Sequence, residues 1–320
     1  MESLSLPEAV QALLKDSAGY HPEYPPDGNS DHLPMALLAM HSLGAPQTVL
    51  TAFRQSYSQR LVPMTNPADT AILRLNQEYQ HEVEMLGIDQ LVARRLPPLL
   101  SSLTRGAFHP LIRLGYGIEF DLPGEVAAAL AYLHWLHNQA ETTGLMPDVV
   151  PTLIPTREDL RDFLLAQVQR GAPELAGQRF DARLTALEQQ GLMPGIQAEN
   201  FDECARVALD VYLSTRNFFA LHMVTATWAA RQCAMLLEQP ESCLAALSSG
   251  LAAAHLILGA PSFHPEQVQA APAGLDEEHL FKYLFVCRQE YAGTGDQRYP
   301  AEFQRFAATG RVPDWLTGIA

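Results

Sequence analysis

The chain has 320 residues, of which 48% are hydrophobic and 18% charged, so it has enough apolar side chains for a large core and too few charges for a disordered protein. Its net charge of −15 disfavours nucleic acid and anionic membranes as partners, because both attract a positive protein face. The four cysteines show no CxxC spacing, and no apolar run reaches the length of a membrane span without a charge or a histidine. The sequence therefore predicts a soluble, cytoplasmic protein with reduced thiols.

Apolar residues recur at helical spacing almost throughout, and no Asn-Gly or Asp-Gly turn joins two β-branched runs, so an all-α fold is predicted. In chain order, helices are expected over 7–15, from Ser30 or Asp31 to 43, 70–86, 89–104 with an interruption at two prolines, 110–119, 124–140, 157–170, 181–190, 202–237, 241–258 and 276–291. The Pro/Gly-rich residues 21–30 are expected to be irregular. Thr156 to Asp159 resemble a capping box for helix 157–170, and Gly171 is typical of its end.

The domain organisation is predicted from the lack of any internal boundary. The length would allow two domains, but no composition shift or flexible linker divides the chain. We expect a single large helical domain over 1–320 with a central cavity, covered by the long Pro-rich connections at 140–155 and 259–275. The oligomeric state stays open, a homodimer included.

Several common catalytic motifs are missing from the sequence. Gly115-Tyr116-Gly117 has no third glycine and no predicted strand before it, so it is not a dinucleotide fingerprint. Neither GxxxxGK[ST] nor GxSxG occurs, which disfavours a phosphate-binding loop and a hydrolase elbow. The remaining candidates for chemistry are the eleven histidines, several of which lie at the edges of apolar segments.

Lysine is rare in this chain, with only Lys15 and Lys282 among 21 basic residues. Lys282 follows His279 by three positions on an apolar helix, so the two side chains project on the same side and Lys282 is expected to be desolvated. A desolvated lysine, unlike arginine, can lose its proton, and its amine can then form a Schiff base, act as a general base or bind carbon dioxide as a carbamate. A carbamate beside histidines would complete a site for iron or another imidazole-binding metal. The alternative is a lysine whose stem packs on the core while its ammonium reaches a carboxylate such as Glu278.

Ordinary structural roles are open to the other histidines. His32 and His109 both lie at predicted helix starts, where a histidine is commonly a cap or a packed ring. His222 lies in an apolar stretch where a ring usually bonds to a backbone carbonyl. The i, i+3 pair of His134 and His137 is a rival for metal binding.

Three segments of the chain each contain a distinctive motif. Residues 29–45 contain an Asn-His element followed by Leu-Gly-Ala, residues 109–119 read HPLIRLGYGIE, and the apolar helix around His222 precedes His279 and Lys282 in DEEHLFKYL. Together they resemble the questin oxidase family, helical oxygenases that act on anthraquinones and related polyketides. The second segment is the most specific match.

The resemblance implies an oxidoreductase of the Baeyer–Villiger or ring-opening type. Some members are similar to non-haem iron enzymes with several histidine ligands and a carboxylated lysine. On the matching positions, the implied ligands of Fe(II) are His32, His109, His222, His279 and a carbamate of Lys282. This set leaves one octahedral position for dioxygen or a substrate oxygen. Fungal members carry histidines where this chain has other residues, at Asp31, Met35, Ala36 and Arg113.

We therefore predict an oxygenase that uses iron and dioxygen to oxidise or ring-open a small aromatic, polyketide- or quinone-type substrate. His109 and Tyr116 are the candidates for catalysis. The candidates for an apolar substrate-binding wall are Tyr116, Phe218, Phe219 and Trp228. One alternative is an NADPH-dependent Baeyer–Villiger-type oxidase without bound metal, and another is a non-enzymatic helical binder of a hydrophobic metabolite whose histidines are structural.

Overall fold

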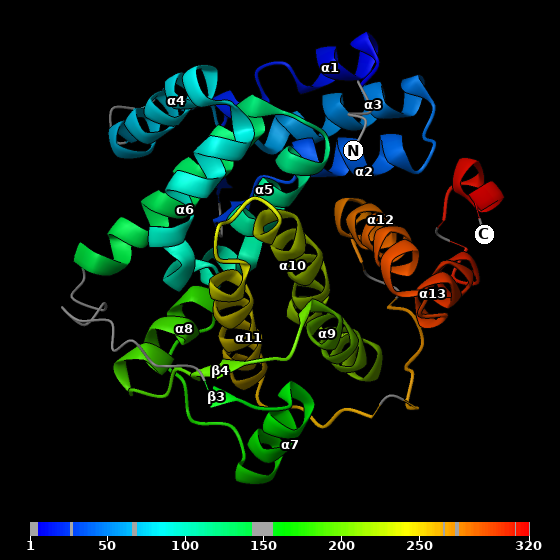
Figure 1. Cartoon of the computed structure of the whole chain (residues 1–320). Coiled ribbons are helices and arrows are strands. Elements are labelled where there is room, and N and C mark those ends of the chain that lie inside the picture. The colour runs from blue at the N-terminus through cyan, green and yellow to red at the C-terminus, as the bar shows by residue number, and fades with distance from the viewer. Residues whose placement is uncertain are drawn as a thin grey trace.

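The computed structural model describes residues 6–25, 28–65, 69–142, 156–264, 266–272, 275–310 and 312–319, and it confirms the all-α fold (Figure 1). The α-helices are α1 (Glu8–Leu14), α2 (Leu33–Ser42), α3 (Gln47–Tyr57), α4 (Thr70–Arg95), α5 (His109–Glu119), α6 (Pro123–Thr142), α7 (Leu160–Arg170), α8 (Phe180–Gln189), α9 (Phe201–Thr215), α10 (Phe218–Ala234), α11 (Pro240–Ile257), α12 (Glu277–Thr294) and α13 (Arg298–Ala307). Short 3-10 helices are η1 (Ser17–Gly19), η2 (Ser58–Arg60), η4 (Pro97–Ser102), η5 (Arg105–Phe108) and η6 (Asp314–Ile319).

Two pairs of very short strands were not predicted. They are β1 (Glu23–Tyr24) with β2 (Asn29–Ser30), antiparallel, and β3 (Thr156–Arg157) with β4 (Ile196–Gln197), parallel. The expectation of an irregular segment at 21–30 was therefore wrong in part. The capping box was also wrong, because pairing with β4 keeps Thr156 extended and the cap of α7 is Asp159, which accepts from the backbone N of Asp162 at 3.0 Å. Gly171 ends α7 as predicted.

The predicted helix 202–237 is two helices. Arg216 between them adopts the left-handed conformation, with φ of 51°, and Asn217 caps α10 by accepting from the backbone N of Phe219 at 2.9 Å. The guanidinium of Arg216 pairs with the buried carboxylate of Glu302 on α13. Helices α3 and α13 were missed because each is mostly polar and buries only a narrow apolar stripe.

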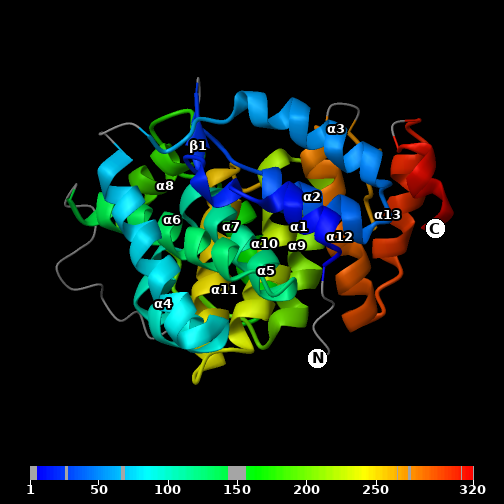
Figure 2. The ribbon, with the colours of Figure 1, turned by 90° about the horizontal axis from the view of Figure 1, so that it is seen from above.

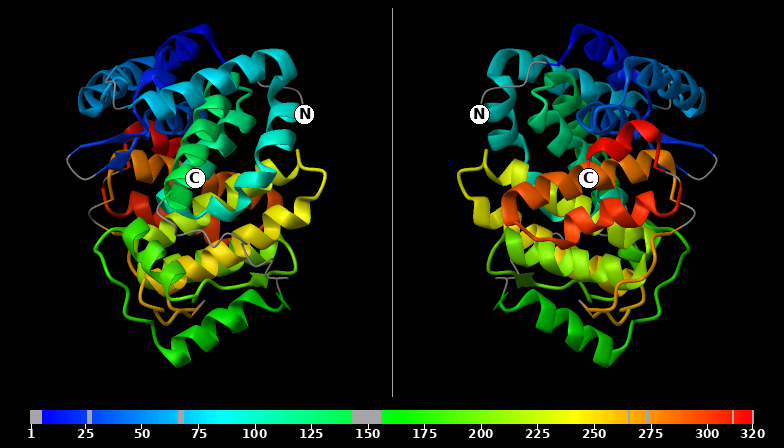
Figure 3. Two further views of the ribbon diagram at one scale, coloured as in Figure 1. Left: turned by 90° about the vertical axis from the view of Figure 1, so that its left-hand side faces the viewer. Right: turned by 90° about the vertical axis from the view of Figure 1, so that its right-hand side faces the viewer.

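Helix α10 lies in the middle of the molecule. It contacts α5, α9, α11 and α12, and its residues from 220 to 230 are all buried. Helices α4 and α6 lie on one flank and α12 and α13 on the other (Figures 1 and 2). Helix α7 lies at the end of the molecule opposite α1–α3 (Figure 3). Within the described ranges, none of the helices combines the length and the apolar character needed to cross a membrane.

Glycine allows α5 to approach α10 closely. A Cβ at Gly115 would lie 2.6 Å from the Cβ of Ala229, and one at Gly117 would lie 2.8 Å from a methyl group of Val126 on α6. Contacts this short require glycine. These two glycines therefore serve helix packing, which brings the start of α5 next to the start of α10.

Candidate metal centre

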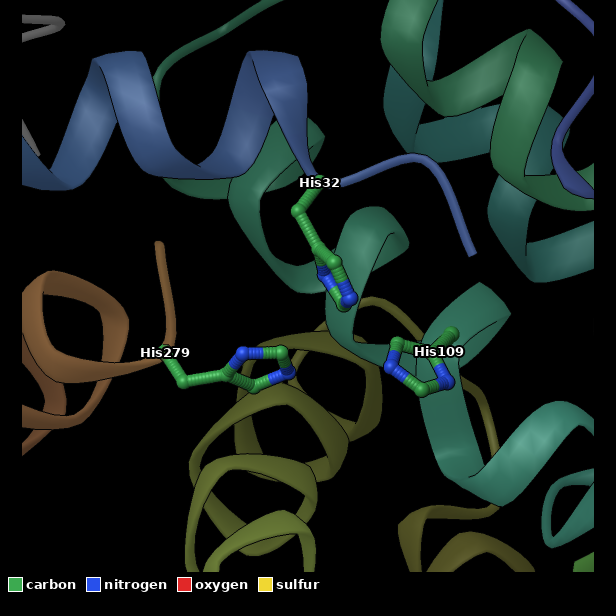
Figure 4. Close-up of side chains that lie close together, drawn as sticks. All are labelled: His32, His109 and His279. Atoms are coloured by element: carbon green, nitrogen blue, oxygen red, sulfur yellow. The ribbon is translucent and has the colours of Figure 1, made fainter. Parts of the chain in front are cut away.

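Three buried histidines converge from the starts of three helices. His32 immediately precedes α2, His109 is the first residue of α5 and His279 is the third residue of α12. Each offers a ring nitrogen that lies within 4.8 Å of a nitrogen of the other two, and Figure 4 shows the rings pointing toward one another. The fold thus joins residues that are up to 247 positions apart in sequence.

His222 adds a fourth ring from the first turns of α10, with its Nε2 3.1 Å from the Nε2 of His109, although it is not one of the three histidines whose ring nitrogens all lie within 4.8 Å of one another. Each of these two rings uses its Nδ1 to donate to a backbone carbonyl, His222 to Phe218 at 2.9 Å and His109 to Gly106. A carbonyl oxygen only accepts, so each Nδ1 carries the hydrogen and each Nε2 of the neutral rings carries a lone pair. Two lone pairs therefore face each other across 3.1 Å.

His279 is the least satisfied of the four. It is 4% exposed, and neither of its ring nitrogens has a hydrogen-bond partner in the described part of the chain. Its ring centroid lies 4.5 Å from that of His32 and 5.4 Å from that of His222. Buried polar atoms without a partner are uncommon in native proteins and call for a missing group.

Lys282 lies beside the histidines and is 1% exposed. Its Nζ is 2.6 Å from the Nδ1 of His32. Burial lowers the pKa of Lys282 to about 7, against the opposing influence of Glu278 and Asp31. The alternative was an ammonium that reaches Glu278; the near contact of the Nζ is instead with His32, and Glu278 pairs with Arg60 at 3.1 Å while still acting on the pKa of Lys282 through its charge.

All four histidines are neutral near pH 7. Burial is the main cause, and the charge of Lys282 adds to it: the pKa of His222 falls to about 3, and the pKa values of His32, His109 and His279 fall well below their usual range. The partial positive charge at a helix N-terminus acts in the same direction, because it disfavours an imidazolium. Protons therefore do not occupy the lone pairs that face the centre of the cluster.

A cavity of about 670 Å³ opens beside the histidines. The predicted wall residues Phe218 and Phe219 line it. Phe218 is 41% exposed, and the centroid of its ring lies 4.6 Å from that of His279. Tyr116 and Trp228 do not line it. Their rings lie 5.0 Å apart in a buried aromatic cluster with Phe285. Both residues lie on buried faces of their helices and pack in the core, so the prediction that they line the substrate cavity was wrong.

The connections expected to cover the cavity do not do so where they are described. The lining includes residues from 23–30 and 178–181, and none of the described residues of 259–275. Residues 143–155 of the other connection lie outside the described residues. Part of the cavity wall therefore comes from β1, β2 and the start of α8, which the sequence did not place at the cavity, in addition to Phe218 and Phe219.

Two rival ligand groups are weaker than the four-histidine cluster. His134 and His137 are half-buried on α6, and each already has a partner: Tyr79 Oη at 2.8 Å and Ser102 Oγ at 2.9 Å. A second group joins His279 to two carboxylates of the α12 N-terminus, Asp276 and Glu278. It shares His279 with the first group, and Glu278 is engaged in its ion pair.

The comparisons with known proteins place the chain in a family. The sequence profile described as questin oxidase-like matches residues 29–300, a range that holds all five candidate ligands. The chain belongs to the questin oxidase-like family. The resemblance inferred from the three sequence segments is thereby confirmed.

Curated relatives of this questin oxidase-like chain match it over a shorter stretch. It is 26% identical over 133 residues to a Baeyer-Villiger oxidase of Aspergillus sp. (strain MF297-2), and the match covers 39% of this chain and 31% of the relative. It is 27% identical over 156 residues to a Baeyer-Villiger oxidase of Pestalotiopsis fici, and 29% identical over 153 residues to a Baeyer-Villiger monooxygenase of Cryptosporiopsis sp. (strain 8999), each match covering 40% of this chain and 34% of the relative. The chain thus spans about a third of the length of these relatives.

An ionic layer lies behind His32 in this questin oxidase-like protein. Arg113, buried on α5, donates from Nε to Glu125 at 2.8 Å and lies 3.8 Å from the Oδ2 of Asp31. The Oδ1 of Asp31 accepts from the backbone N of Leu33 at 2.8 Å, which fixes the start of α2 and so the position of His32. From the sequence, Asp31 is a possible helix start and a difference from fungal members, and its pairing with Arg113 was missed. The signal was an arginine inside the apolar segment HPLIRLGYG.

Proposed function

We propose that the protein is a non-haem iron oxygenase that uses dioxygen to oxidise or ring-open an aromatic, polyketide- or quinone-type substrate. Membership of the questin oxidase-like family and the Baeyer-Villiger names of the relatives support the oxygenase class. The donor atoms around the cavity support the metal.

One observation carries the proposal, the two Nε2 lone pairs of His109 and His222 that face each other at 3.1 Å. Without a cation between them this contact is repulsive, and burial disfavours a proton there. A metal ion would satisfy both nitrogens together with the unpartnered ring of His279. Several imidazoles with one carboxylate-like oxygen form a donor set suited to iron.

Lys282 would supply that oxygen as a carbamate. Its neutral amine would attack the carbon of carbon dioxide: the N–C bond forms as one C=O π bond breaks and its electron pair moves to oxygen, and one proton passes from the nitrogen to water or bicarbonate. The product is anionic, and the N-termini of α2, α5, α10 and α12 all approach this place, where helix dipoles favour negative charge. The ligands would then be His32, His109, His222, His279 and the carbamate of Lys282.

The side chains around the metal would position the substrate and exclude bulk water. When bound, iron would supply dioxygen activation and Lewis acidity toward the substrate. Phe218 offers a half-exposed ring at the cavity edge, on which a planar aromatic substrate can stack beside His279. The histidines and Lys282 are buried, so the reacting face is screened from bulk water. Tyr116, at a distance from the cavity lining, receives no role in the chemistry.

The electron balance separates the two forms of the reaction. Insertion of one oxygen atom requires a two-electron reductant such as NADPH, because the second atom of dioxygen must leave as water. Ring cleavage that incorporates both atoms requires no reductant. The metal-free NADPH-dependent alternative and the non-enzymatic binder both leave the facing lone pairs of His109 and His222 without a partner.

Metal analysis of tag-free protein tests the proposal. We expect about one iron per chain after purification with ferrous iron and bicarbonate, and less without bicarbonate. Dioxygen uptake with a hydroxyanthraquinone as the probe, with and without NADPH, then separates the two reaction forms. Protein that stays metal-free under both conditions would contradict the metal centre.

A Phe218→Ala variant is expected to bind a hydroxyanthraquinone about 2- to 12-fold more weakly, because a lost aromatic contact costs about 0.5–1.5 kcal/mol. Tyr291→Ala is the matched control, because Tyr291 is a similarly exposed aromatic residue outside the cavity lining. Fluorescence titration of the zinc-loaded protein measures both affinities. Equal affinities in the two variants would remove Phe218 from the substrate wall.

A further inference from the structure

The loop before His109 holds three successive residues in the left-handed conformation. The φ angles are 62° at Gly106, 50° at Ala107 and 67° at Phe108. Glycine adopts this conformation freely, but it costs about 1 kcal/mol or more at each of the two other residues. Such a backbone persists only when its surroundings hold it.

The loop also sets the ring of His109. The Gly106 carbonyl accepts from the Nδ1 of His109, which fixes the tautomer and turns Nε2 toward His222. The position of Gly106 therefore decides the direction of a candidate ligand atom.

Helix α8 holds this loop at three points. The Oδ1 of Asp181 accepts from the backbone N of Gly106 at 2.9 Å. Glu188 accepts from the buried guanidinium of Arg105 at 2.7 and 2.8 Å. The ring of Phe180 lies 6.3 Å from that of Phe108.

We propose that Asp181 is a positioning residue for His109: by anchoring Gly106 it holds the carbonyl that orients the imidazole. The inference rests on the proposed metal centre. Asp181 reaches no metal-facing nitrogen itself, and its effect passes through the backbone of the loop. Phe180 and Asp181 also line the cavity, so a bound substrate lies against the same helix start that sets His109.

Two variants of Asp181 distinguish the effect of its hydrogen bond to Gly106 from the effect of its negative charge. Asp181→Ala removes the acceptor and leaves the Gly106 N–H unpaired, whereas Asp181→Asn keeps an oxygen in place. Loss of an outer hydrogen bond to a ligating histidine typically weakens metal binding about 10- to 100-fold. Asp181 acts one step further out, through the Gly106 backbone, so we expect the lower end of that range, about 10-fold, in Asp181→Ala and wild-type affinity in Asp181→Asn. Asp202→Ala is the control, because it removes an exposed carboxylate that pairs with Arg231 outside the cavity lining.

Cobalt(II) titration against a chromophoric chelator measures the affinity, and the visible spectrum of the bound cobalt reports the ligand set. A changed cobalt spectrum in Asp181→Ala, with the spectrum restored in Asp181→Asn, would support positioning rather than general destabilisation. Wild-type protein that binds no cobalt would overturn both this inference and the proposed function. Wild-type affinity and spectrum in Asp181→Ala, or an equal loss in Asp202→Ala, would overturn this inference alone.

Discussion

A Lys282→Ala variant is expected to lose stoichiometric iron, with its metal affinity reduced at least about 100-fold, because a lost ligand costs more than the 10- to 100-fold of a lost outer contact. The substitution removes the amine that would form the carbamate and leaves a space beside His32. A small carboxylate added to the buffer can enter that space and offer the same kind of oxygen donor. We therefore expect acetate or propionate to restore part of the metal binding, measured as iron per chain after gel filtration.

Lys15→Ala is the matched control for this experiment. Lys15 is the only other lysine of the chain, and it lies exposed at the end of α1. This variant should keep its iron and its dependence on bicarbonate. If Lys282→Ala binds iron as tightly as the wild-type protein, Lys282 is not a ligand, and a centre built from histidines alone would remain.

Much of the fold follows from local patterns along the sequence. The starts and ends of α5, α6 and α11 lie within one or two residues of the predicted limits, because strong apolar periodicity and prolines mark them. The break between α9 and α10 was missed because its turn uses Arg216 rather than glycine or proline. That left-handed residue is held by Glu302, 86 positions away, a contact that no local pattern reveals.

The candidate ligands were foreseeable for a chemical reason. A lysine with an apolar neighbourhood and histidines at helix starts are unusual enough to be visible in one sequence. The residues that orient them are not. Asp181 lies 75 positions from Gly106. An acidic residue in the first turn of a helix is common, so nothing in the sequence marks it. The aromatic residues show the same limit, because Phe218 and Trp228 belong to one helix and only the first reaches the cavity.

The second large effect concerns His222 and separates the stability of the metal-free protein from its metal binding. In the metal-free protein its Nε2 lone pair faces that of His109 at 3.1 Å. A His222→Gln variant replaces one lone pair with an amide N–H₂ that can donate to His109. The variant also gives up the bond from the Nδ1 of His222 to the Phe218 carbonyl, so we expect the gain of about 1 kcal/mol toward His109 to offset that loss and the free energy of unfolding of the metal-free variant to stay close to that of the wild-type protein. Iron binding should fall at least about 100-fold, because a ligand is lost.

His255→Gln is the matched control, because it makes the same substitution at another buried histidine. His255 is also fully buried, but its Nδ1 lies 2.8 Å from Gln167 Oε1 and its Nε2 lies 3.0 Å from the carbonyl of Pro261. Glutamine can replace its Nε2 donor to the Pro261 carbonyl but not its Nδ1 contact with Gln167, and its described contacts include no facing lone pairs to relieve, so the same substitution there should lower the free energy of unfolding by about 1 kcal/mol and leave iron binding unchanged. Urea unfolding of the metal-free proteins measures both changes. A His222→Gln protein destabilised as much as His255→Gln would mean that the His109–His222 contact is already favourable without a metal, because a proton lies between the two nitrogens, and the main argument for the metal centre would fail.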